Sequence, residues 1–362
     1  MPDNDPAVEP ARHGRRGPRV TLQDVADRAG VSITTASRVV NEGSRRVGAQ
    51  LALRVHQAVA EMGYTANLQA RAVATGRSSL VGVVVHDIAD PYFSSIAAGL
   101  IDLAGPHQLL VCLSSTPADE AAEREYVALM RAQRARAVVL IGSRTDNAGA
   151  REALAGEIAA FGRQGGRAVC IGQPLLGVDT IAPGNAAGAE ALARSLVAVG
   201  HRRFAVLAGP RGLLTGHDRV EGFRAGLAAW SLGLNGADVV HGPFTRDGGY
   251  EAMSAILAGG GSLPDCVFAV NDVMAVGALA RLRAARILVP DDIALAGFDD
   301  ILTLRDVTPP LTTVRLPLKR MGEMAANLVL TDGDPGQPRI VPVPGEVIMR
   351  DSTLPRPAPR FP

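Results

Sequence analysis

Three residues between positions 33 and 38 carry side chains that can contact DNA bases. Arg38 can pair bidentately with guanine, and Thr34 can hydrogen-bond to either type of base pair. Ile33 offers only an apolar contact, to a thymine methyl group or to a sugar. At helical spacing these side chains and Ser37 share one face. The opposite face is apolar and holds Ala36, Val39 and Val40. The spacing indicates a helix that reads a DNA sequence, although any small helical hairpin has the same periodicity.

Two further helices are expected to position this one. Thr21 begins a first helix, and Asp24 completes a capping-box pattern with it. Gly30 ends that helix, and Ser32 caps the DNA-reading helix. A third helix is expected to end at Gly63. Two short helices joined by a tight glycine-containing turn form a helix-turn-helix, which can present its second helix to the major groove.

The remainder of the chain alternates apolar runs with amphipathic segments from residue 79 onward. Continuous apolar strands separated by helices indicate parallel sheets that are covered on both faces. The expected strands are residues 79–86, 109–115, 137–142 and 168–172, and then 203–209, 266–270 and 293–298. This length suits two doubly wound lobes, so the fold class is α/β behind a small helical domain.

Polar and aromatic residues follow several of these strands, where ligands of doubly wound sheets bind. They are Asp87, Asp90, Tyr92, Phe93, Gly172, Gln173, Asn271, Asp272, Asp299 and Asp300. Between two facing lobes they would form a cleft with aromatic walls and polar anchors, which suits a sugar or a nucleobase. Asp or Asn after a strand can instead cap the next helix. We favour that capping role for Asp272 and Asp300.

Charge is distributed unevenly along the 362 residues. The first 77 residues hold 11 arginines and 7 acidic residues, whereas the remainder holds 26 basic and 29 acidic residues. A basic N-terminal segment followed by a mildly acidic remainder suits a phosphate-binding domain attached to a domain that binds a different kind of ligand. At 47% hydrophobic residues the chain is expected to be globular.

Composition and motifs disfavour several other classes of protein. No apolar run is long enough for a membrane span, and the first 18 residues do not resemble a secretory signal. Cys112, Cys170 and Cys266 lie in apolar runs without zinc-ligand spacing, so reduced core positions in a cytoplasmic protein are expected. Phosphate-binding loops, nucleophile elbows and HExxH motifs are missing. We therefore expect no enzyme activity, no catalytic residues, no metal site and no cofactor.

Residues 20–41, V-T-L-Q-D-V-A-D-R-A-G-V-S-I-T-T-A-S-R-V-V-N, closely resemble the headpiece of the lactose-repressor family of bacterial transcription regulators. The resemblance extends over about residues 19–355 through D-P-Y-F (90–93), R-V-E-G-F (219–223), V-N-D-V-M-A-V-G (270–277) and G-F-D-D (297–300). It implies a three-helix headpiece and a two-lobed effector domain similar to periplasmic sugar-binding proteins. In such a domain the chain crosses between the lobes three times, and residues 318–330 are expected to return to the first lobe. The implied divisions are a flexible arm (1–18), a helix-turn-helix domain (19–65), a hinge (66–78), an effector domain (79–355) and a tail (356–362).

The resemblance also assigns DNA contacts. Ile33, Thr34 and Arg38 occupy the base-reading positions. The phosphate-contacting or capping positions are Ser32, Thr35, Ser37 and Asn41. In the hinge, Asn67 is a DNA contact, and Val73 stands at the position of an apolar wedge for the minor groove, where relatives usually have Leu. A plain linker is the alternative for this segment.

For the effector, the resemblance implies that Phe93 and Phe244 flank a ring to which Arg219, Asn271 and Asp299 hydrogen-bond. Tyr92 and Gln173 complete the expected set, and His217 is a weaker candidate. Gly172-Gln173 and Gly184-Asn185 replace more charged residues of the family, which leaves the effector's identity open.

The sequence thus predicts a ligand-responsive regulator, most simply a repressor of catabolic or transport genes. It would be a cytoplasmic, nucleoid-associated homodimer on a pseudo-palindromic DNA operator, with a sugar or sugar derivative as effector. The alternatives are a nucleobase-responsive corepressor-type regulator, a solute-binding protein with an unusual front, and an enzyme on an α/β scaffold.

Overall fold

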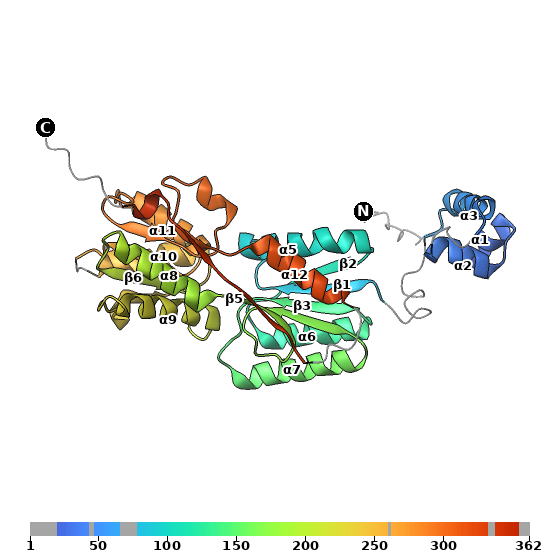
Figure 1. The fold of residues 1–362 in the computed structure, drawn as a ribbon, viewed down its shortest axis with the longest axis horizontal. Coiled ribbons are helices and arrows are strands. Elements are labelled where there is room, and N and C mark those ends of the chain that lie inside the picture. The colour runs from blue at the N-terminus through green and yellow to red at the C-terminus, as the bar shows by residue number, and fades with distance from the viewer. Residues whose placement is uncertain (1–19, 43–46, 66–77, 260–261, 332–336, 355–362) are drawn as a thin grey trace, which may run out of the picture. The chain divides into compact units, whose positions relative to one another are not determined.

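The computed structural model describes residues 20–42, 47–65, 78–259, 262–331 and 337–354 (Figure 1). The chain divides into two compact units, one ending at Ser78 and one beginning at Ser79. Each unit is described by itself. Among the described residues, no helix combines the length and apolarity needed to cross a bilayer.

The first unit is the three-helix headpiece, with α1 at Leu22–Ala29, α2 at Ile33–Glu42 and α3 at Ala49–Met62. The predicted capping box is confirmed, because Thr21 N donates to Asp24 Oδ2 at 2.8 Å and Asp24 N donates to Thr21 Oγ1. Gly30 adopts the left-handed conformation (φ +62°) that the tight turn requires. A small apolar core, in which Val25, Ala36 and Val55 are buried, joins the three helices.

The second unit begins with lobe 1, which is built on a six-stranded, wholly parallel sheet in the order β11-β5-β4-β3-β1-β2. Its strands are β1 (Leu80–Val85), β2 (Leu110–Ser115), β3 (Ala137–Ile141), β4 (Arg167–Ile171), β5 (Asp179–Pro183) and β11 (Ile340–Val343). Its helices are α5 (Pro91–Ala104), α6 (Glu120–Ala132), α7 (Ala148–Arg163) and α12 (Leu318–Leu330). Because α5 packs on α12 and α6 on α7, both faces of the sheet are covered (Figure 1).

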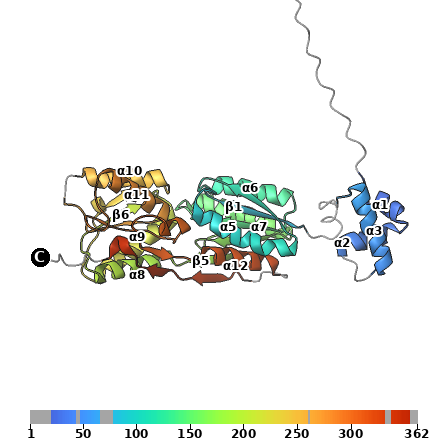
Figure 2. The ribbon, with the colours of Figure 1, turned by 90° about the horizontal axis from the view of Figure 1, so that it is seen from above.

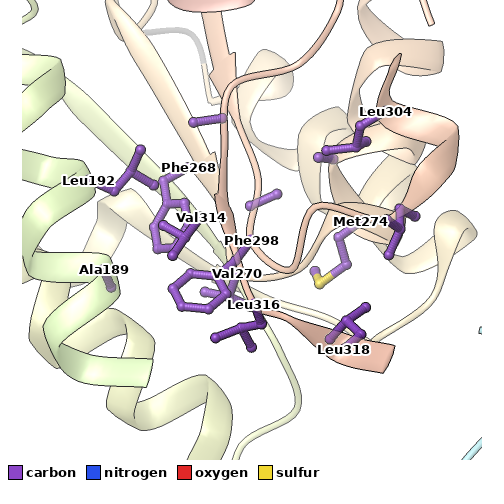
Figure 3. Packing of buried hydrophobic residues seen from close by; sticks show 14 of the residues in the cluster. Ala189, Leu192, Phe268, Val270, Met274, Phe298, Leu304, Val314, Leu316 and Leu318 are labelled. Atoms are coloured by element: carbon purple, nitrogen blue, oxygen red, sulfur yellow. The ribbon is translucent and has the colours of Figure 1, made fainter. Parts of the chain in front are cut away.

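Lobe 2 has a four-stranded parallel sheet in the order β7-β6-β8-β9. Its strands are β6 (Phe204–Ala208), β7 (Val239–His241), β8 (Cys266–Ala269) and β9 (Ala294–Ala296). Its helices are α8 (Asn185–Ala198), α9 (Leu214–Ala228), α10 (Arg246–Ala258) and α11 (Asp272–Ala284). In Figure 2, α10 and α11 lie on one side of this sheet and α8 and α9 on the other. Phe268 and Phe298 pack with Leu192 and Val314 in its core (Figure 3).

Three segments connect the lobes, as predicted. The first follows β5, and the second joins β10 (Thr313–Arg315) to α12. The third joins β11 to β12 (Glu346–Ile348), which pairs antiparallel with β10. The predicted return of residues 318–330 to lobe 1 is confirmed, because α12 packs on α5. There the backbones touch, since a Cβ added at Gly99 would collide with the carbonyl of Lys319.

Two expectations about the body are wrong. Cys112 is exposed, whereas Cys170 and Cys266 are buried, because β2 is the edge strand and turns side chains to solvent on both faces. Asp272 and Asp300 cap no helix. Asn271 caps α11 instead, while Asp272 accepts hydrogen bonds from Ile301 N at 2.9 Å and Thr313 Oγ1 at 2.8 Å. The carboxylate of Asp300 pairs with arginines at positions 315 and 350.

Candidate nucleic-acid interface and ligand cleft

The outward face of α2 presents the predicted base-reading side chains. Ile33 is 47% exposed, and Thr34 and Arg38 are also exposed. Because the Arg38 side chain is exposed on this face, its guanidinium can donate to a base edge.

The start of α2 is fixed by its own hydroxyl groups. Thr35 N donates to Ser32 Oγ at 3.1 Å, and the two hydroxyls lie 2.9 Å apart. This confirms Ser32 as the cap of α2. Ser37 is half-buried on the same helix. The side chain of Asn41, and Asn67 and Val73 entirely, lie outside the described residues.

A cavity of about 350 Å³ lies between lobe 1 and lobe 2. Six of the seven predicted effector residues line it: Tyr92, Phe93, Arg219, Phe244, Asn271 and Asp299. Lobe 1 contributes the ends of β1 and β3 and the start of α5, and lobe 2 contributes α9 and the ends of β6, β7 and β8. The strand-end rule therefore identifies much of the cleft.

Arg219 forms the polar floor of this cleft. Its Nε donates to Asn185 Oδ1 at 2.9 Å, Nη1 to Val270 O at 2.6 Å and Nη2 to Asp299 Oδ1 at 2.8 Å. The guanidinium also stacks 3.8 Å above the ring of Phe298. With its side chain 3% exposed, Arg219 is held rigidly from three directions. A ligand would meet a preorganised polar surface here.

The carboxyl group of Asp299 is a titratable group in the floor of the cleft. Burial, with a smaller contribution from the charge of Asp90, raises the pKa of its carboxyl to about 7 against the opposing effect of the Arg219 guanidinium. Asp90 caps α5 by accepting from Tyr92 N, and burial raises its own pKa as well. The floor is therefore rich in hydrogen-bond acceptors and carries little positive charge that is not already paired.

Aromatic rings supply the apolar walls. Tyr92 and Phe93 meet edge to face with ring centroids 5.0 Å apart at the start of α5. Phe244 follows β7, and its ring lies so close to Gly209 that an added Cβ there would overlap it. Flat apolar walls over a polar floor match a ring that has hydroxyls at its edge and C–H bonds on its faces.

Gln173 occupies a different place from the one predicted. It does not line the cavity, and its amide joins the lobes. Gln173 Oε1 accepts from Arg144 N at 2.9 Å, and its Nε2 donates to Thr215 Oγ1 and Asp218 Oδ2, each at 3.0 Å. His217, the weaker candidate, is exposed on α9 and does not line the cavity either.

Sequence reasoning missed this seam between the lobes, which residues 143–146 and 212–215 form. Leu214 N donates to Arg144 O at 2.9 Å, Asp146 N to Gly212 O at 2.8 Å, and Thr215 N to Ser143 Oγ at 2.9 Å. Ser143 and Thr215 also line the cleft. Ser143 could have been found, since it lies two residues after the end of the apolar strand β3. Thr215, its partner across the seam, has no comparable signal in the sequence.

Two family models match the chain. One, described as bacterial regulatory proteins of the lacI family, matches residues 21–67, and one for a periplasmic binding protein-like domain matches residues 193–353. The HTH-type transcriptional regulator GalR of Escherichia coli (strain K12) is 33% identical over 316 residues, which cover 87% of this chain and 89% of GalR.

Two solved structures show the same architecture. A lac repressor dimer bound to operator and the anti-inducer ONPF has a TM-score of 0.79 and 27% identity, covering 93% of this chain and all of that chain. A complex of the transcriptional regulator CelR with cellobiose has a TM-score of 0.66 and 28% identity, covering 92% of this chain and all of that chain.

Proposed function

The chain belongs to the lacI family of bacterial regulatory proteins, and on that premise we propose that it represses transcription from an operator under the control of a sugar-like effector. The observation that carries the proposal is the exposed face of α2, with Ile33, Thr34 and Arg38 turned outward from a packed three-helix core. The family consists of transcriptional regulators, and we assign this chain no catalytic role. Its target DNA would place it in the cytoplasm, at the nucleoid.

The DNA-binding unit would be residues 19–65, with residues 66–78 as a hinge and residues 79–355 as the effector domain. Base reading would come from Ile33, Thr34 and Arg38, and phosphate contacts from Ser32, Thr35, Ser37 and Asn41. Asn67 and Val73 would add contacts in the hinge. A dimer would place two headpieces on half-sites about one helical turn apart, which a pseudo-palindromic operator provides.

The effector would bind in the cleft, with its ring between Phe93 and Phe244 and its hydroxyls on the floor of Arg219, Asn271 and Asp299. Two observations support a sugar-like ligand: the acceptor-rich floor between aromatic walls, and the CelR relative, whose structure contains cellobiose. Tyr92 would contribute to the wall. Gln173 would act on the angle between the lobes, through its bonds to α9.

Coupling between cleft and DNA requires that the effector bind one arrangement of the lobes better than another. Asp299 links the cleft to a segment that crosses between the lobes, because its backbone N donates to Val314 O at 2.8 Å. An effector bound to the Asp299 carboxyl would therefore act on that segment through Asp299. A change in the angle between the lobes would then alter the hinge and hence the grip on the operator.

The test begins with selection of duplexes from a randomised pool by the full-length protein. Affinity for the selected duplex is then measured by fluorescence anisotropy at fixed salt, with and without neutral mono- and disaccharides and purine bases. We expect a two-fold symmetric site and a change in affinity of about 5- to 150-fold with at least one sugar. Absence of any sequence preference would refute sequence-specific DNA binding. A change in affinity with purine bases alone would refute the proposal that the effector is a sugar.

A further inference from the structure

Beneath the lobe 1 wall of the cleft lies a buried cluster of His86, Glu123 and Arg144. The Arg144 and Glu123 side chains are 0% and 1% exposed. Arg144 Nη2 donates to Glu123 Oε1 at 2.8 Å, and Nη1 donates to Oε2, so the guanidinium holds the carboxylate bidentately. Neither the DNA-reading face nor the Arg219 floor uses this cluster.

His86 is the member of the cluster that reaches the cleft. It follows β1 and lines the cavity, with its side chain 11% exposed. Its Nε2 faces Glu123 Oε1 at 3.5 Å, is buried and has no hydrogen-bond partner. Its ring lies 5.5 Å from the ring of Phe93, centroid to centroid. The imidazole is therefore packed between the aromatic wall and a buried carboxylate.

Gly142, at the end of β3, makes room for this ring. A Cβ added there would overlap the imidazole, and the glycine has φ +147°. The backbone at this strand end thus fits the imidazole closely, and a larger residue at position 142 would displace it.

The surrounding charges determine which ring nitrogen carries the proton. Glu123 faces Nε2, so the neutral ring is best accommodated with a proton on Nε2 and a lone pair on Nδ1. Asp87 is the next residue along the chain, Asp90 lies on the same cavity wall, and Glu120 is already bound to Thr145. Nδ1 is then the ring nitrogen that remains to serve a ligand.

We propose that His86 is a specificity-determining residue of the cleft, whose Nδ1 accepts a hydrogen bond from a hydroxyl of the effector. Glu123 and Arg144 are positioning residues that set the tautomer and the orientation of the ring. This contact would lie on the lobe 1 side, apart from the floor formed by Arg219 and Asp299. The inference rests on the proposed function, since it assumes that the cleft binds a polyhydroxylated effector.

Two measurements test it, and the first needs no effector. Nitrogen-15 NMR of the histidine rings, with the His86 signals assigned by their loss in His86→Gln, reports the tautomer of His86. We expect the Nε2-protonated form in the wild type and a mixture of tautomers in Glu123→Gln. A Nδ1-protonated wild-type ring would overturn the inference, even if no sugar of the panel acted on the protein.

The second measurement is titration calorimetry with whichever sugar alters operator binding. Loss of one buried hydrogen bond should weaken binding of that sugar by about tenfold in His86→Leu, with partial recovery in His86→Gln, whose amide oxygen can still accept. His107→Leu is the matched control, because His107 is exposed in the 3-10 turn after α5.

Operator affinity without sugar should be equal in His107→Leu and the wild type. Sugar affinity unchanged in His86→Leu would overturn the inference while leaving the regulatory function intact. If none of the sugars alters operator binding by the wild type, the proposed effector class fails and the hydroxyl contact fails with it, whereas the tautomer measurement still decides whether Glu123 sets the ring of His86.

Discussion

Asp299 accepts a 2.8 Å hydrogen bond from Nη2 of Arg219, a residue 80 positions earlier in the chain. Arg219 lies on α9, whereas Asp299 follows β9 and adopts φ +117°, a conformation that a non-glycine residue rarely takes. Strain of this kind persists only where surrounding contacts maintain it, and here Asp299 is held through both its backbone and its carboxylate. The pair therefore joins the ligand floor to a segment that crosses between the lobes.

The raised pKa of Asp299 makes the free energy of unfolding depend on pH. In the folded protein its carboxyl has a pKa of about 7, against an ordinary value of 3.8, so the folded state holds this proton more tightly. The contribution to stability is full below about pH 4, falls as the pH rises to about 7 and is constant above that. Urea titrations of the wild type and Asp299→Asn should therefore show a difference that changes over this interval.

Asp90 and Asp272 also have raised pKa values, whereas Asp179, Asp265 and Asp300 have lowered ones, so the stability of either protein alone combines opposing titrations. Only the difference between the two proteins reports Asp299. A difference that stays flat from pH 4 to 7 would show that Asp299 is ionised throughout.

The seam between the lobes predicts a stability effect at Gln173. Gln173→Ala removes three hydrogen bonds, to Arg144 N, Thr215 Oγ1 and Asp218 Oδ2, and should lower the free energy of unfolding by about 1–3 kcal/mol. Gln164→Ala is the control, because Gln164 is exposed at the end of α7. Equal denaturation midpoints for the two variants would mean that the seam adds nothing to stability.

Sequence patterns could locate the central strands, because β1, β3, β6 and β8 are runs of buried apolar residues. They could not locate β5, which begins at the polar Asp179 and ends at Pro183, or β7, which has only three residues. Strand-end polarity identified Asp299 and Asn271 for the cleft. The same rule misplaced Gln173, because its role depends on partners 42 and 45 residues away on another lobe, and such pairings have no local signal.

The contact between α5 and α12 predicts that Gly99→Ala is strongly destabilising. The added Cβ would meet the backbone carbonyl of Lys319, which cannot yield without moving α12, so we expect a loss of about 1–3 kcal/mol or more. Gly156→Ala is the control, since Gly156 is exposed on α7 with open space around its Cα. Thermal unfolding of both variants tests the claim. A Gly99→Ala protein as stable as Gly156→Ala would show that α5 and α12 can move apart without cost.

The DNA-reading face of α2 predicts a loss of specificity in Arg38→Ala. Because the Arg38 side chain is exposed and can pair bidentately with guanine, its removal should cost about 1–3 kcal/mol at the selected site and relax the preference at one base pair. Anisotropy against the selected duplex and its single-base variants measures both effects. Arg28→Ala removes the same charge from the headpiece, but Arg28 lies on α1 and pairs with Glu61, so it should leave the base preference unchanged. If Arg38→Ala instead weakened binding to every duplex equally and lowered the salt dependence, Arg38 would contact a phosphate rather than a base.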